Sequence, residues 1–460
     1  MAAPDRAPVL LLTALSTFLG AAAVGRVRSL DTLSPPDLAF FTQSTWSAAS
    51  GLGFAQTALE FDQGSLLGSI HLSLVRLLWV PLWWAWPSPS ALTALQAIAV
   101  STIVWLAWTR QPGRGLTLAG ALALGLHPLA MALACVDLRP IVFFVPGAAL
   151  VVAGLARDRA TVVLGGAVLC VLAREEAPWV LGAMLPFAAH LGHRRRRWAG
   201  SLVLCAAVLT AIGLPLAVWG HGSNITSSAD PLATVQQILA GTRPVFRWSQ
   251  ETRFFARCVA AGVPALLAPR LLAPALLGWL WLMVFSDLEP VAPGSGGLHY
   301  LAVVAALFLP AVGVGMHRAA NRWGAPKVGI FALLMSIVAG SPEFVSSATW
   351  AVHTPATAQA LTALVQPLKA HTLPVLVPPL LAPHLAARPT LRILGHFAAD
   401  PERVSAVAHE VHDAVLAEVR PPAGPAADEW ALWQAALVEA GLQPVATAAG
   451  WSHWTRAVPK

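Results

Sequence analysis

The sequence predicts an all-α polytopic membrane protein with about eleven transmembrane helices and a small C-terminal α/β domain. Three observations predict this fold class: a composition dominated by apolar residues, repeated apolar runs close to the length of a membrane span, and a change of pattern near residue 341. Of 460 residues, 57% are hydrophobic and 11% are charged, and the mean hydropathy is +0.66. Because soluble domains carry about 25% charged residues, the composition excludes a water-soluble enzyme.

The apolar runs define the predicted spans, since a transmembrane helix needs about 17 to 25 mostly apolar residues. Runs that meet or approach this length lie near 8–25, 89–109, 115–134, 140–156, 160–173, 176–191, 198–219, 254–272, 274–286, 299–317 and 328–340. The first run resembles a signal peptide, but its weakly basic start favours an uncleaved first span. We therefore expect a transmembrane domain over residues 1–340.

Residues 31–88 form the predicted first outer loop. Within it, residues 66–86 are apolar but interrupted by Arg76 and Pro81, which favours a helix in the membrane interface, with a transmembrane helix as the alternative. Tryptophan side chains favour the membrane–water interface. Four of them close this segment, at Trp79, Trp83, Trp84 and Trp86.

The charge distribution predicts the orientation, because short cytoplasmic loops carry an excess of Lys and Arg. A cytoplasmic N-terminus places the following loop cations inside: Arg110, Arg114, Arg157, Arg159, Arg194 to Arg197, Arg270, Arg318, Arg322 and Lys327. Arg26, Arg28 and the group from Arg243 to Arg257 are exceptions. Most acids of the membrane region fall on the opposite, extracytoplasmic side, so an acidic outer face is expected.

The net charge of +7 does not indicate a nucleic-acid partner, since the arginines are scattered between apolar spans rather than gathered on one face. The expected partner is the lipid bilayer. The four cysteines stand singly, without a CxxC or metal-like spacing, and are interpreted as packing residues with neither a disulfide framework nor a zinc site: Cys135, Cys170, Cys205 and Cys258.

From about residue 341 the apolar runs shorten and polar residues increase. Residues 373–379, 391–397 and 443–449 are typical of short buried strands, and residues 401–419 and 428–441 are typical of amphipathic helices. Residues 341–460 are therefore expected to form a small α/β domain on the extracytoplasmic side.

The segment Ser34-Pro35-Pro36-Asp37 follows the first span and has two interpretations. Ser34 as N-cap, Pro35 at the first helical position and an acid three residues after Ser34 form a start that resembles a capping box. The same arrangement also fixes one carboxylate at the membrane surface, where it could serve chemistry.

Charged residues also stand between later spans, at Asp137-Leu138-Arg139 and at Arg174-Glu175-Glu176. Neighbouring charges at membrane depth could simply form local ion pairs that close helix ends. The second segment has one carboxylate in excess, which could act as a general base or share a divalent cation with Asp37.

These residues match a known pattern. Asp37, Phe41, Gln43, Trp46 and Gly51 have the spacing of the opening motif of the bacterial family called domain of unknown function 2079. Further short motifs agree in the family's order at His71, Ser73, residues 86–97, Asp137, Pro140, Glu175, Glu176, His299, Tyr300 and residues 381–388. Departures stand at Thr42, Leu74 and Arg139, where the family usually has Asp, Pro and His.

The plan of this family resembles the GT-C superfamily of membrane glycosyltransferases. The resemblance implies transfer of a sugar from a polyprenyl-phosphate-linked donor to an acceptor at the outer face of the bacterial cytoplasmic membrane. It makes Asp37, Glu175 and Glu176 candidate catalytic residues, and Asp37 and Asp137 possible ligands of a divalent cation. The candidate substrate-binding residues are Gln43, Trp46, His71, Asp137, Arg139, Arg174, His299 and Tyr300.

Two other classes of function remain open. A transporter or flippase of lipid-linked material would have ionisable residues within its spans and paired broken helices. A non-catalytic assembly protein would use the outer domain to bind a partner.

Overall fold

The computed structural model describes residues 7–32, 34–58, 73–104, 118–174, 176–190, 236, 240, 250–285, 298, 300–394, 401–417 and 427–456. Helices dominate residues up to 370: α1 (Ala7–Arg28), α2 (Pro35–Ala49), η1 (Leu74–Leu78), α3 (Trp79–Ala85), α4 (Pro89–Ser101), η2 (Thr102–Val104), α6 (Leu118–Gly125), α7 (Pro128–Cys135), η3 (Pro140–Phe143), α8 (Phe144–Arg157), α9 (Ala160–Ala173), α10 (Ala177–Gly182), α11 (Leu185–His190), α14 (Gln250–Ala261), η5 (Val263–Leu267), α15 (Pro269–Phe285), α16 (Leu301–Trp323), α17 (Ala325–Val352), α18 (Ala356–Val365) and η7 (Pro367–Ala370).

In the described part of the chain, four helical segments are long and apolar enough to cross a membrane: Val9–Arg28, Pro140–Arg157, Leu301–Trp323 and Ala325–Val352. The pair α6 and α7, bent by 51°, makes a fifth if it is one broken span. Other predicted runs form shorter apolar helices, and residues 198–219 lie outside the described residues. The count of eleven spans therefore stays a prediction.

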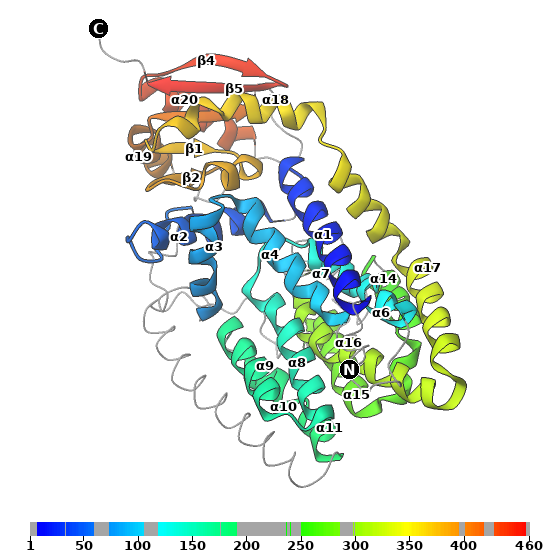
Figure 1. Ribbon diagram of the computed structural model, residues 1–460. Helices are drawn as coiled ribbons and strands as arrows, with labels where there is room; N and C mark the ends of the chain where they lie inside the picture. Colours follow the sequence, from blue (N-terminus) through cyan, green and yellow to red (C-terminus); the bar gives the residue numbers. More distant parts are fainter. Residues whose placement is uncertain are drawn as a thin grey trace.

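The helix α17 differs from expectation in its length. It runs without interruption from Ala325 to Val352, so the expected boundary at residue 340 falls inside a helix. Helix α17 lies parallel to α1, since Phe18 stacks on Phe344 with ring centroids 5.4 Å apart and the Ser29 hydroxyl donates to the His353 carbonyl at 3.1 Å. Both helices end at the same end of the molecule (Figure 1).

Close contact between α1 and α17 requires a glycine. A Cβ built at Gly25 would lie 1.7 Å from the carbonyl oxygen of Trp350, so any larger side chain would force the helices apart. Small residues at such crossings allow helix backbones to approach in membranes, where van der Waals contact replaces the hydrophobic effect as the source of attraction.

The tryptophans in α3 and directly after it divide between two environments. Trp79 and Trp83 are buried in the helical core, whereas Trp84 and Trp86 are exposed. The interpretation of all four as interfacial anchors is therefore wrong for Trp79 and Trp83, because α3 is short and turns one face toward α2.

The chain ends in a five-stranded sheet with the order β2-β1-β3-β5-β4. Its elements are β1 (Val375–Val377), η8 (Pro379–Leu385), β2 (Leu391–Ile393), α19 (Pro401–Glu410), β3 (Asp413–Ala417), α20 (Ala427–Glu439), β4 (Leu442–Ala448) and β5 (Trp451–Arg456). Strand β1 is parallel to β2 and β3, and β5 is antiparallel to β3 and β4.

Most of the predicted elements of this domain are confirmed, with two corrections. The strand predicted over 443–449 is present as β4, but it is mostly exposed rather than buried. The predicted helix over 401–419 ends at Glu410, and residues 413–417 instead form the central strand β3. All five residues of β3 are buried, and a fully buried strand has no alternation that would distinguish it from a helix by pattern. Strand β5 was not predicted.

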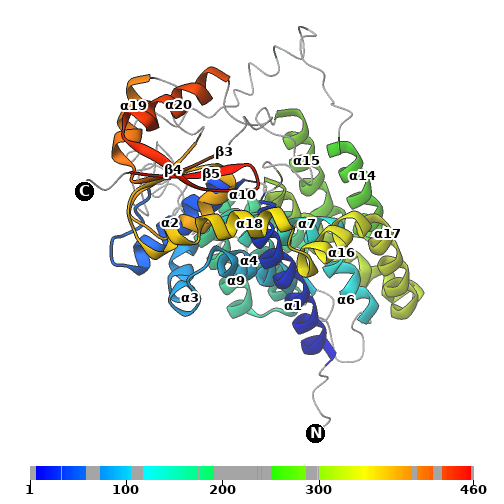
Figure 2. The same cartoon turned by 90° about the horizontal axis from the view of Figure 1, so that it is seen from above.

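The sheet caps the end of the helical bundle at which α1 and α17 terminate (Figure 1). Helices α19 and α20 cover one face of the sheet and lie away from the bundle (Figure 2). The other face joins α18, η8 and α2 in a single apolar cluster that includes Ala39, Ala58, Leu361, Val375 and Leu385. The C-terminal unit is therefore docked on the first loop after α1.

His384 adds a polar contact to this docking. Its Nε2 atom lies 3.1 Å from the carbonyl oxygen of Val27, at the end of α1. Burial, reinforced by nearby Lys369, lowers the pKa of His384 to about 4 from 6.5. The imidazole of His384 is thus uncharged in the folded protein at neutral pH.

The protein is expected to lose stability in acid through this histidine. Between pH 6.5 and about 4 the unfolded chain protonates His384 and the folded chain does not. The stability is therefore complete above pH 6.5 and falls toward pH 4, by about 2 kcal/mol at pH 5. Thermal unfolding in detergent at pH 7 and pH 5 measures the loss, which His384→Gln should reduce. His409→Gln, an exposed histidine on α19, should leave it unchanged; equal effects of the two variants would contradict the assignment.

Candidate functional site

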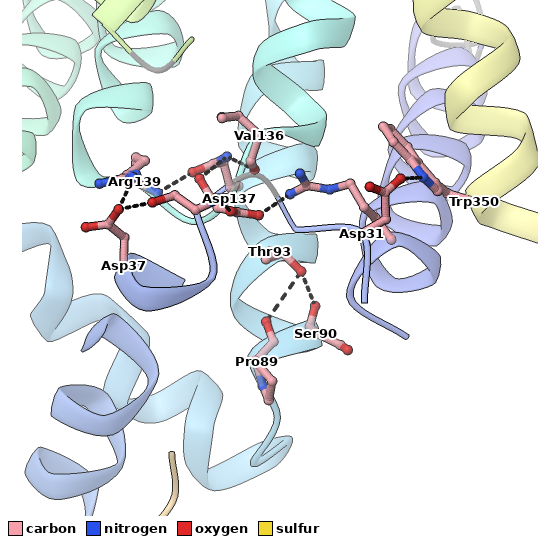
Figure 3. A network of polar contacts seen from close by, with 12 residues as sticks. Asp31, Asp37, Pro89, Ser90, Thr93, Val136, Asp137, Arg139 and Trp350 are labelled. Carbon is pink, nitrogen blue, oxygen red and sulfur yellow. Dashed lines mark hydrogen bonds and ion pairs between the residues drawn. The ribbon is translucent and has the colours of Figure 1, made fainter. Parts of the chain in front are cut away.

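Asp137 is the centre of a polar network (Figure 3). It lies between α7 and η3 and is fully buried. Its Oδ1 accepts a hydrogen bond from Arg26 at 2.6 Å, and its Oδ2 accepts one from the backbone N–H of Ser34. One carboxylate therefore joins the end of α1, the start of α2 and the turn after α7.

The turn that carries Asp137 is held by Gln96 of α4. The Gln96 amide donates to the carbonyl of Val136 at 2.8 Å, and its oxygen accepts from the backbone N–H of Arg139 at 2.8 Å. Helix α7 ends at Cys135, and Pro140 begins the next helical segment, so the Val136 carbonyl and the Arg139 N–H lie outside the hydrogen bonds of both helical segments. The buried amide of Gln96 supplies their partners.

Arg26 is fully buried near the end of α1. Its guanidinium also lies over the ring of Trp350, 5.7 Å from the ring centroid. The Trp350 indole N–H donates to Asp31 at 2.6 Å. Because a buried charge costs several kcal/mol unless it is paired, Arg26 requires both its carboxylate and its aromatic neighbour.

Asp37 lies in the first turn of α2, with Ser34 as N-cap and Pro35 at the first helical position, as predicted. The Ser34 hydroxyl donates to the Asp37 carboxylate instead of capping a backbone N–H. Arg139 binds the same oxygen, Oδ2. The side chain is 32% exposed, and within the described residues Oδ1 accepts no hydrogen bond. Asp37 thus has one anchored and one accessible oxygen.

Asp137 and Arg139 do not form the local ion pair considered from the sequence, whereas the segment Arg174-Glu175-Glu176 does contain a local pair. Asp137 pairs with Arg26, and Arg139 pairs with Asp37, so both pairs connect segments more than 100 positions apart, with separations of 111 and 102 residues. Arg174 pairs with Glu176 at 3.0 Å at the junction of α9 and α10. Helix α9 contacts η3, which directly follows Arg139.

Gln43 is buried between the two units of the protein. Its amide nitrogen donates to the carbonyl of Arg388 at 2.9 Å and to the Thr57 hydroxyl at 3.0 Å, and its oxygen accepts from the backbone N–H groups of Thr57 and Ala58 at 2.8 and 3.0 Å. This geometry joins α2 to the C-terminal domain.

The remaining predicted residues lie in different places. Trp46 is half-buried on α2 and packs against the helical core, and Tyr300 is half-buried at the start of α16. His71, Glu175 and His299 lie outside the described residues.

The described residues do not fit the divalent cation considered from the sequence. Asp37 and Asp137 each bind an arginine, whereas Mg²⁺ or Ca²⁺ prefers a set of oxygen ligands. Among residues that the structure describes, no group of three or more His, Cys, Asp or Glu side chains is placed to hold a metal.

A second titratable cluster surrounds Asp413 in the C-terminal sheet. His453 and His412 contact its carboxylate at 3.0 and 2.9 Å, and His371 lies 3.4 Å away. Burial alone would raise the pKa of Asp413, but hydrogen bonds from His453, His412 and Thr455 outweigh burial and hold the pKa at about 2. The cluster joins β3, β5 and the segment between η7 and β1.

Comparison with known proteins places the chain in a family. Residues 31–417 match the family described as predicted membrane protein (DUF2079). The match covers most of the chain, so the protein belongs to this family, as the sequence motifs indicated. None of the curated proteins compared with the chain matches it.

Proposed function

We propose that this member of the DUF2079 family is a membrane glycosyltransferase that moves a sugar from a polyprenyl-phosphate-linked donor to an acceptor hydroxyl. The observation that carries the proposal is the geometry of Asp37. One carboxylate oxygen is fixed by Arg139 and Ser34, and the other is accessible directly after the first span. A carboxylate held in this way can accept a proton in a defined direction.

The proposed reaction uses Asp37 as a general base. The acceptor hydroxyl gives its proton to Oδ1 of Asp37 while its oxygen forms a bond to the anomeric carbon of the sugar. The bond from that carbon to the phosphate oxygen breaks, and polyprenyl phosphate leaves with the electron pair. Arg139 is a positioning residue in this scheme, since its contact is to Asp37.

The supporting network makes this position rigid. Asp137 binds the backbone of Ser34, and Gln96 holds the turn that carries both Asp137 and Arg139. A catalytic group gains from such support, because a misplacement of about 1 Å can cost about 100-fold in rate. Arg174 and Glu176 are proposed to act near Asp37. We propose that this site opens on the outer face of the membrane.

A transporter or flippase is the second candidate function, and one structural observation favours it. Glu343 lies within α17 and pairs with Arg257 of α14 through two hydrogen bonds of 2.7 and 2.8 Å. Together with the 51° bend between α6 and α7, this is the kind of feature expected for a transport pathway. A flippase would move the lipid-linked sugar intact, whereas a transferase would consume it.

The Asp37→Asn variant tests the proposal in cells. The substitution keeps the size of the side chain and removes its basicity, so lipid-linked sugars should accumulate and the glycosylated product should fall by about 100-fold or more. The measurement is the profile of lipid-linked sugars and of cell-surface glycans at equal expression of the protein.

Asp158→Asn is the matched control. Asp158 ends α8 in the left-handed conformation with φ 57°, which asparagine tolerates. Its profile should equal that of the wild type. An unchanged profile in Asp37→Asn would contradict the proposal, and a loss of transbilayer movement without any change in glycosyl transfer would favour the flippase.

A further inference from the structure

A polar cavity of about 600 Å³ lies between the end of α1, the start of α4 and the helix α18 of the C-terminal unit. None of the residues proposed for catalysis or substrate binding lines it. In Figure 1, α18 passes over the end of α1, so the cavity is at the junction of the helical bundle and the docked domain.

The described lining of this cavity is cationic. Arg28 and Lys369 both face it, and no carboxylate is among the described residues that line it. Neither cation has an ion-pair partner within the described part of the chain.

Neutral hydrogen-bonding groups complete the lining. Ser88 and Ser90 lie at the N-terminus of α4, where Ser88 caps the helix by accepting a bond from the Ser90 N–H at 3.2 Å. A helix N-terminus carries partial positive charge and favours an anion. Gln359 and Gln366 add amide groups from the opposite wall.

A second, smaller groove of about 290 Å³ continues from the same residues. Arg28 and Thr354 line both spaces. The groove runs between α1 and α17, along small and apolar side chains that include Ala21, Val24 and Val352. Val352 is 87% exposed, so the groove opens on the outer surface of the helices.

We infer that the cavity and the groove together bind one phosphate-bearing lipid, with the phosphate between Arg28 and Lys369 and the hydrocarbon chain in the surface groove that lies over the contact of α1 and α17. Guanidinium and ammonium groups are the side chains that bind phosphate best. A bare phosphate would leave unused the adjoining groove and its side chains Ala21, Val24 and Val352. The inference does not depend on the proposed glycosyl transfer.

Native mass spectrometry of the full chain in a neutral detergent tests this site. The protein is titrated with phosphatidylglycerol, polyprenyl phosphate, phosphatidylcholine and inorganic phosphate. At least one of the two anionic lipids should bind saturably at one site and at least about tenfold more tightly than the other two probes. The tighter of the anionic lipids identifies the source of the phosphate.

Variants connect the binding to the cavity. The double variant Arg28→Gln/Lys369→Gln should weaken lipid binding about tenfold or more, because it removes two charge-assisted contacts. The control Arg322→Gln/Lys327→Gln removes the same charges at the junction of α16 and α17 and should change nothing. Ala21→Trp, at an exposed position, should obstruct the groove and weaken lipid binding without affecting inorganic phosphate.

Several results would overturn the inference. Equal binding of phosphatidylcholine would remove the role of the anion, and equal binding of inorganic phosphate would remove the role of the hydrocarbon chain. Unchanged affinity in Arg28→Gln/Lys369→Gln would place the lipid elsewhere. Asp37→Asn should keep full lipid binding, which separates a failure of this site from a failure of the proposed catalysis.

Discussion

Replacing Asp137 by alanine is expected to destabilise the protein by about 3–5 kcal/mol, the usual cost of leaving a buried charge without its partner. The reason is that Arg26 and Asp137 are both fully buried and lie 2.6 Å apart. The Ser34 N–H would also lose its acceptor. Chemical or thermal unfolding of the purified protein in detergent measures the change in the free energy of unfolding.

The double variant Arg26→Met/Asp137→Leu is the control. Removing both charges leaves no unpaired ion in the core. Replacing a buried ion pair by apolar residues often leaves the free energy of unfolding unchanged. The double variant should therefore recover most of the loss seen with Asp137→Ala. If both variants lose the same stability, the charge pair is not the cause.

Gln43→Leu is expected to loosen the docking of the C-terminal domain, at a cost of about 2–4 kcal/mol. The substitution leaves the backbone N–H groups of Thr57 and Ala58 and the carbonyl of Arg388 without their partner. Hydrogen exchange should show faster exchange at Thr57 and Ala58 and along β2 than in the wild type.

Gln443→Leu is the matched control, since Gln443 is exposed on strand β4. It should leave exchange at Thr57 and Ala58 unchanged. Wild-type exchange in Gln43→Leu, together with weaker substrate turnover, would instead assign Gln43 to the substrate.

The apolar pattern predicted much of the helical region, because a helix in a membrane satisfies its own backbone and hydropathy reports its position. The apolar pattern failed to predict the secondary structure at positions where tertiary packing determines it. The α17 helix continues past residue 340 because its polar residues, such as Glu343, find partners inside the bundle. Strand β3 was missed because its burial on both faces removes the alternation on which strand prediction depends.

The sequence located Asp37 and Asp137 and two of the groups that hold them, Ser34 and Arg139, but not the others. Arg26, Gln96 and Trp350 come from distant segments, and such contacts are not visible in local spacing.

One sequence signal did point to the missing partners. Arg26, Arg28 and Arg257 are among the cations that disobey the positive-inside pattern. In the structure Arg26 pairs with Asp137, Arg257 pairs with Glu343, and Arg28 lines the cationic cavity. An Arg or Lys that falls on the side opposite to the one expected from the positive-inside rule is thus a candidate for an ion pair or a ligand-binding site.

The most direct test of the account is the fate of a polyprenyl-phosphate-linked sugar incubated with the purified protein and a membrane extract that supplies the acceptor. The wild-type protein should release polyprenyl phosphate and transfer the sugar, and Asp37→Asn should release about 100-fold less while remaining folded. Equal release by Asp37→Asn and the wild type would contradict a catalytic role for Asp37.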